Sequence, residues 1–181
     1  QPSAIKGAVH LNMLDAQGAL RDVKALSLSL DCDLTPAEIR QLALRFAKAG
    51  AALGAVEISG PFDLAQQEGQ LAVAVRGIDR QVLNLAGALG GMDFNQTSLS
   101  STNRIEITRH AQAITVNGQM TADRFSVTQK GQTTPALDLA AAYHLTLNQP
   151  NSNLMVRAFT LTGRQGGNEL LRATLSKPMW I

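Results

Sequence analysis

Apolar and polar residues alternate with a period of two along most of this chain. Segment 137–148 shows the pattern most fully, because every odd position from Leu137 to Leu147 is apolar and polar residues or alanines stand between them. Side chains of a β-strand alternate between its two faces. The segment therefore predicts a strand about 40 Å long, at roughly 3.3 Å per residue, with one continuous apolar face.

The same alternation predicts further strands, and clusters of Gly, Asn, Gln, Thr and Pro separate several of them. The predicted strands fall in segments 3–14, 24–31, 54–64, 69–77, 103–109, 113–122, 123–129, 153–163 and 169–176. Their close spacing favours consecutive antiparallel strands, so the predicted fold class is mainly β with a meander order. The pair Asn117–Gly118 is compatible with a tight hairpin turn or with one longer strand.

Segment 35–50 departs from this period and predicts an amphipathic helix. Thr35, Pro36 and Glu38 match a capping box with proline at the first helical position, and Gly50 is a plausible end. The apolar residues follow at helical spacing: Ile39, Leu42, Ala43, Phe46 and Ala49. Such a helix packs against the sheet or lies on an anionic membrane. The predicted helix has few large apolar side chains, and this favours packing against the sheet over binding to a membrane.

A second, shorter helix is predicted at about 80–89. Its apolar stripe consists of Val82, Leu85, Ala86 and Leu89.

Composition narrows the possible functions. The net charge is only +2 and the basic residues are scattered, whereas nucleic-acid binding usually needs a concentrated basic surface. Aromatic residues make up 4% of the chain, which argues against a base-stacking platform. No apolar stretch reaches the roughly 18 residues that indicate a transmembrane helix, and no signal peptide is evident. From its two ends, we expect residues 1–181 to be a single β-rich segment of a longer polypeptide.

No motif points to catalysis. His10, His110 and His144 each stand alone, without further ligands at metal-binding spacing, and are interpreted as solvent-facing residues. The glycines of "GALGGMD" lack the context of a phosphate-binding loop. The chain is therefore predicted to be non-enzymatic, with no catalytic residue, metal or cofactor.

The acidic residues Asp31 and Asp33 flank Cys32 just before the predicted helix. A carboxylate pair acting in catalysis must converge on one point. We therefore interpret the two carboxylates as solvated groups just before the predicted helix, and not as a catalytic pair. Cys32 is interpreted as a small, inert apolar side chain.

Three stretches resemble AsmA-like proteins, including their TamB-like and YhdP-like relatives. The first, "GAVEISGPFDLAQQEGQLAVAVRGIDRQVLN", carries a G-x-F-D-L strand, an alternating strand and a turn ending in LN. The others are "GQMTADRFSVTQ" and "YHLTLNQPNSNLMVRAFTLTGRQGGNELLRATLS", so the resemblance covers roughly residues 55–177. It implies a long, curled antiparallel sheet in a periplasmic protein anchored in the inner membrane of a diderm bacterium. Phospholipids are expected to pass along its concave face towards the outer membrane, and envelope membrane proteins are possible partners.

An apolar trough suits such a cargo, because each acyl CH₂ kept out of water contributes about 0.8 kcal/mol. The predicted lining residues are Leu71, Val73, Val75, Ile105, Ile107, Ile114, Val116, Leu137, Leu139, Tyr143, Leu145 and Leu147. The same faces equally fit a closed core. The alternative function is therefore a self-contained β-sandwich or β-roll that serves as an interaction or scaffolding module without lipid.

Overall fold

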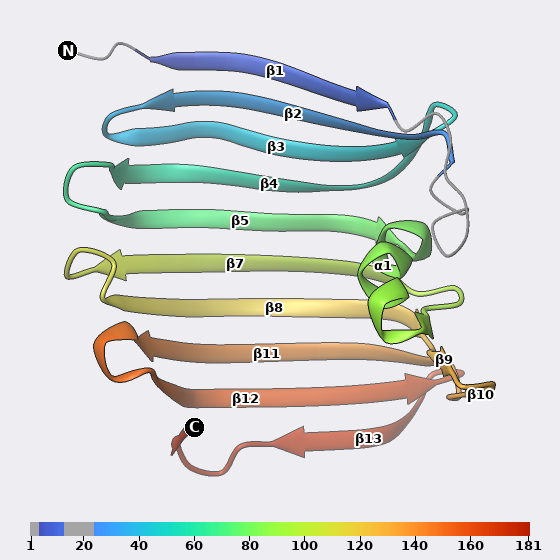
Figure 1. Cartoon of the computed structure of the whole chain (residues 1–181). Coiled ribbons are helices and arrows are strands. Elements are labelled where there is room, and N and C mark those ends of the chain that lie inside the picture. Colours follow the sequence, from blue (N-terminus) through green and yellow to red (C-terminus); the bar gives the residue numbers. More distant parts are fainter. Residues whose placement is uncertain (1–3, 13–23) are drawn as a thin grey trace.

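A computed structural model of the chain describes residues 4–12 and 24–181. Their main element is one large antiparallel sheet (Figure 1). Its strands lie in the order β1–β2–β3–β4–β5–β7–β8–β11–β12–β13, and a short β14 pairs with β12. The strands are β1 (Ile5–Asn12), β2 (Leu26–Thr35), β3 (Glu38–Lys48), β4 (Ala51–Asp63), β5 (Glu68–Asp79), β7 (Ser98–Thr108), β8 (Ala113–Phe125), β11 (Leu137–Asn148), β12 (Asn153–Gln165), β13 (Asn168–Thr174) and β14 (Met179–Trp180).

The predicted mainly-β meander is confirmed. Neighbours in the sheet follow each other along the chain, except where short elements intervene after β5 and β8. A small second sheet is built from β6 (Met92–Asp93), β9 (Thr128–Gln129) and β10 (Gln132–Thr133). The Asn117–Gly118 pair lies inside β8, so it continues a long strand and forms no hairpin turn. Residues 13–14 of the first predicted strand lie outside the described residues.

The predicted helix at 35–50 is wrong, because this segment forms the end of β2, a turn and β3. A β-bulge explains the misleading pattern. Ile39 pairs with Gly60 and Leu42 with Ile58, so two residues of β3 oppose one residue of β4. The extra residue changes the apolar spacing from two to three at this point, and three is a helical spacing.

The supposed capping box is the turn between β2 and β3. Thr35 pairs with Glu38, and its hydroxyl donates a hydrogen bond to the Glu38 carbonyl at 3.2 Å. The carbonyls of Pro36 and Ala37 accept hydrogen bonds, each 3.0 Å long, from the backbone N–H groups of Leu64 and Phe62. Threonine and proline favour turns as well as helix starts, so the local sequence did not distinguish the two.

The second predicted helix is present as α1 (Arg80–Gly87), followed by the 3-10 turn Ala88–Gly90. Asp79 caps it, because its carboxylate accepts a hydrogen bond from the backbone N–H of Gln81 at 2.9 Å. Val82 and Leu85 pack against a cluster around Leu26, whereas Ala86 is exposed. The Leu89 side chain lies outside the described residues.

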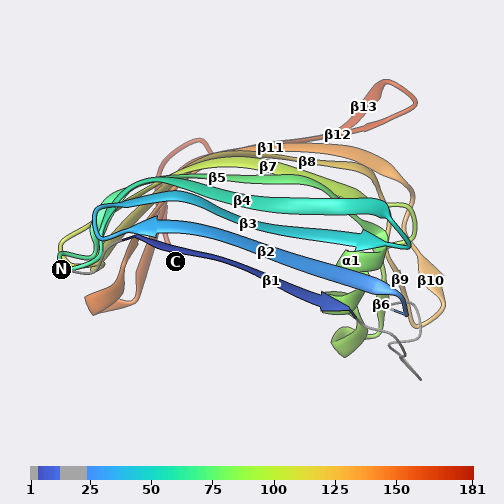
Figure 2. The same cartoon turned by 90° about the horizontal axis from the view of Figure 1, so that it is seen from above.

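The sheet is arched, and α1 lies on its concave side (Figure 2). The residues under α1 include Leu26, Leu53 and Phe46, which identifies the concave face as the apolar one. Domains usually bury apolar faces between two packed layers. Among the described residues only seven apolar side chains are buried, so most of this sheet remains a single layer.

On the convex face, charged residues of neighbouring strands form ion pairs. Asp31 forms an ion pair with Arg45, Asp33 with Lys6 at 2.8 Å, and Arg76 with Glu57 at 2.9 Å. Asp31 and Asp33 were predicted to be solvated residues at the start of a helix, and this prediction is wrong. They form ion pairs with basic side chains of neighbouring strands.

Candidate functional site

Cross-strand register places apolar side chains in continuous rows on the concave face. In one row Leu71 pairs with Ile105, Ile105 with Val116, Val116 with Leu145, and Leu145 with Val156. Directly paired residues of adjacent strands project from the same face. Five apolar side chains therefore stand side by side across β5, β7, β8, β11 and β12.

All twelve predicted lining residues share this face. Val73 and Val75 follow Leu71 along β5, and the row Ile107–Ile114–Leu147 runs parallel to the first one. Leu137, Leu139 and Tyr143 occupy the same side of β11. Every one of the twelve is half-buried, neither sealed in a core nor fully exposed. Contact between these residues and lipid stays a prediction.

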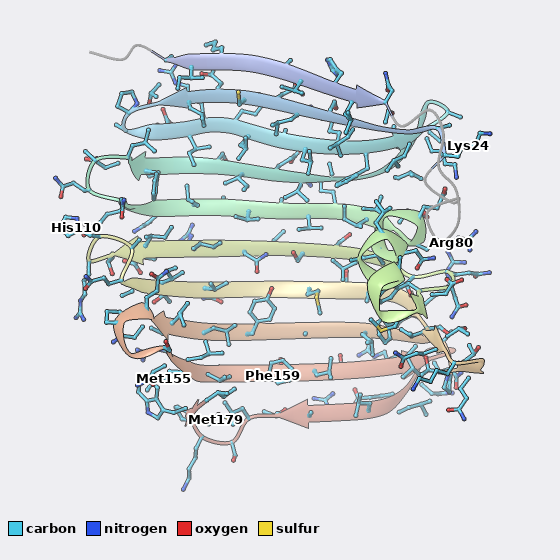
Figure 3. All side chains as sticks on the ribbon, viewed as in Figure 1. Lys24, Arg80, His110, Met155, Phe159 and Met179 are labelled. Carbon is cyan, nitrogen blue, oxygen red and sulfur yellow. The ribbon has the colours of Figure 1, made fainter. Side chains whose placement is uncertain are left out.

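An apolar groove of about 670 Å³ lies on this face over β8, β11 and β12. The twelve predicted residues contribute three members, Leu139, Tyr143 and Leu145. Figure 3 labels Phe159 and Met179, two of the others. The residues that line the groove are Leu99, Met120, Ala122, Phe125, Leu139, Ala141, Tyr143, Leu145, Val156, Phe159, Leu161, Leu175 and Met179.

Sequence reasoning missed the other ten residues that line the groove. Phe159 and Leu161 belong to a predicted strand, and their alternation places them on the same side. Met179 lacks any such signal, because it reaches the groove only through the pairing of β14 with β12, where it lies opposite Val156.

At one end of the strands the concave face is covered by α1. The helix is held to the sheet by a 2.7 Å hydrogen bond from Lys48 Nζ to Gln81 Oε1. On its other side, the Asn84 side chain donates to Asp93 and accepts from the backbone N–H of Phe94, at 3.0 and 2.8 Å. Val82 and Leu85 of the helix thus cover residues of β2, β3 and β4, and the groove over β8, β11 and β12 lies outside this covered cluster.

One polar cluster interrupts the apolar face near mid-strand, and we call it the polar trio: Ser101, Asn103 and Tyr143. The Tyr143 hydroxyl donates to Asn103 Oδ1 at 2.6 Å, and Asn103 Nδ2 donates to Ser101 Oγ at 3.1 Å. Register confirms the shared face, since Asn103 pairs with Gly118 and Gly118 with Tyr143. All three members are half-buried.

The histidines lie away from the groove. His10 is exposed on β1, and His144 lies on the polar side of β11. His110 belongs to the turn after β7, where its Nδ1 is 2.8 Å from the Gln66 carbonyl oxygen (Figure 3). In the part of the chain that the structure describes, no group of three or more His, Cys, Asp or Glu residues could hold a metal ion.

Among the described residues, two carboxyl groups have a lowered pKa, each because of local hydrogen bonds. A hydrogen bond from the Asn84 side chain and another from the Asn95 backbone lower the pKa of Asp93. Hydrogen bonds from Arg172 lower the pKa of Glu169 in the β12–β13 hairpin. Neither residue lines the groove.

Comparisons with protein-family models, curated proteins and solved structures found no match. Among the helices of residues 4–12 and 24–181, none has the length and apolar character needed to cross a membrane.

Proposed function

We propose that this chain is a segment of an AsmA-like periplasmic protein, anchored in the inner membrane, whose concave face shields phospholipid acyl chains on their way between the two membranes. One observation carries the proposal: apolar rows cross the sheet from strand to strand while their side chains stay half-buried. The resemblance of residues 55–177 to that family supports the same function.

The energetics favour acyl chains as the occupant. A chain of about sixteen carbons loses roughly 13 kcal/mol when it is transferred bare into water, at 0.8 kcal/mol per CH₂. Transport also requires weak, equivalent contacts, because a single site of high affinity would hold the lipid and stop its movement. Leu, Val and Ile side chains in repeated rows supply such contacts without directional bonds.

A second candidate is an interaction module that carries no lipid. It is favoured by edge strand β1, where Ile5 is 61%, Val9 62% and Leu11 56% exposed. An exposed apolar edge strand is a template for pairing with another chain. The packed sandwich that this alternative predicted is not the arrangement of the described residues, whose main sheet is largely one layer.

Site-specific photocrosslinking tests the lipid proposal. A photoreactive amino acid is placed at Leu139 or Leu145, which line the groove, and at Ala140 or Ala142, which are exposed on the opposite face of the same strand. Each purified variant is illuminated with vesicles of labelled phosphatidylethanolamine. We expect lipid adducts at the two leucine positions and few at the two alanine positions.

The alanine positions are matched controls, because they lie on the same strand and differ in face. Equal labelling at all four positions would indicate nonspecific contact and would contradict the groove. Absence of adducts at Leu139 and Leu145 would favour the interaction module.

A further inference from the structure

The polar trio lies on the concave face beside the groove, because Tyr143 lines the groove whereas Ser101 and Asn103 stand next to it. Tyr143 on β11 reaches Asn103 on β7 across the intervening strand β8. It can do so because β8 carries Gly118 between them, where a Cβ atom would lie 2.1 Å from Asn103 Oδ1 and 2.8 Å from the Tyr143 ring. Three strands thus contribute to one polar bridge, on a face whose other positions are mostly apolar.

The bridge leaves donors unused. An asparagine amide has two N–H hydrogens, and a serine hydroxyl has one O–H hydrogen. Asn103 Nδ2 uses one hydrogen on Ser101 Oγ. Among the described residues, no acceptor is found for its second hydrogen or for the Ser101 hydroxyl hydrogen. All three residues of the trio are half-buried, so the cluster is not sealed inside a core.

We propose that the polar trio binds an acceptor oxygen of an acyl lipid, an ester carbonyl or a chain hydroxyl, and so fixes the register of the lipid along the concave face. This inference rests on the proposed lipid-shielding function and adds a polar recognition point to it. The Leu, Val and Ile rows accept any hydrocarbon, whereas the free donors of Asn103 and Ser101 distinguish an oxygenated lipid from a plain chain.

A competition between matched lipids tests this inference. The protein is incubated with equimolar vesicles of dipalmitoyl phosphatidylcholine and its dihexadecyl ether analogue, which differ only in the two carbonyl oxygens. After re-isolation, the retained lipids are counted by mass spectrometry. If the ester carbonyl gains one net hydrogen bond, the wild-type protein is expected to retain about five times as much ester lipid as ether lipid. A parallel competition between stearate and mid-chain hydroxystearate distinguishes a hydroxyl from a carbonyl as the bound group.

Three variants make the test specific. Asn103→Leu removes the donors and the bridge, and Ser101→Ala removes one donor while the Tyr143–Asn103 bond remains. Each variant leaves the donor of the other residue in place, so both are expected to lower the wild-type preference. Thr102→Ala is the matched control, because Thr102 is exposed on the opposite face of β7, and it is expected to keep the wild-type preference. Far-ultraviolet circular dichroism confirms that each variant is folded.

Two results would overturn the inference while leaving the proposed function intact: retention of both members of each lipid pair at equal levels by wild type, or an unchanged preference in both donor variants. Failure of wild type to retain any of these lipids would overturn the inference and the proposed function together.

Discussion

The Tyr143 hydroxyl lies 2.6 Å from Asn103 Oδ1, although the two residues are 40 positions apart and a whole strand separates them. The bond fastens β11 to β7 across β8. Aromatic side chains that cover a glycine on a neighbouring strand help to fix strand register, and here the hydroxyl adds a directional bond. This pair is also a polar point on a mostly apolar concave face, beside the groove that Tyr143 lines.

Gly118→Ala is expected to destabilise the protein by about 2 kcal/mol, the usual scale of overpacking. The added Cβ would lie 2.1 Å from Asn103 Oδ1, so the bridge must break or the backbone must shift. The midpoint of urea unfolding measures the change.

Gly7→Ala is the control for that substitution. Its Cβ would lie 3.5 Å from Cys32 Sγ, an ordinary contact, so a change within about 0.5 kcal/mol is expected. Equal losses in both variants would show that Gly118 has no special packing role.

Tyr143→Phe keeps the ring over Gly118 but removes the hydroxyl, leaving Asn103 Oδ1 without its donor. We expect a loss of about 1 kcal/mol in the free energy of unfolding. A double-mutant cycle with Asn103→Leu checks the cause, since two residues that interact directly give non-additive losses. Simple additivity would argue against a stabilising bond.

Leu53→Ala is expected to cost about 2–3 kcal/mol, because Leu53 is 7% exposed in the cluster under α1. Hydrogen exchange of the α1 amides should also accelerate, as Val82 and Leu85 lose a packing partner. Leu64→Ala removes a side chain that is 55% exposed and should change stability by less than about 0.5 kcal/mol. Unchanged α1 exchange in Leu53→Ala would contradict the packing of α1 on this cluster.

The lowered pKa of Asp93 is expected to make the stability of the protein depend on pH. The hydrogen bond from Asn84, supported by the Asn95 N–H, lowers its pKa from 3.8 in the folded state. A lowered folded-state pKa means that the carboxylate stabilises the fold above the unfolded-state value, and that this contribution is lost as the pH falls through the folded-state value. Asp93→Asn keeps the acceptor oxygen but does not titrate. Between about pH 5 and about pH 2, the urea midpoint should fall further in wild type than in Asp93→Asn, and parallel curves would contradict this account.

Much of the fold followed from local alternation. In β11, the odd positions from Leu137 to Leu147 share one face, because consecutive side chains of a strand point in opposite directions. This rule predicted most strands and placed all twelve candidate lining residues on one side. It failed at residues 39–42, where a bulge adds one residue and mimics helical spacing.

The sequence by itself determined which side chains of a strand face the same way, since covalent backbone geometry enforces that choice within a few residues. Only the tertiary structure decided that the apolar face is covered at α1 and open over β8, β11 and β12. It also decided that Met179 meets Val156 and that Tyr143 meets Asn103 across Gly118. These contacts depend on which distant strands become neighbours and in what register, and alternation within one strand carries no information about its partners.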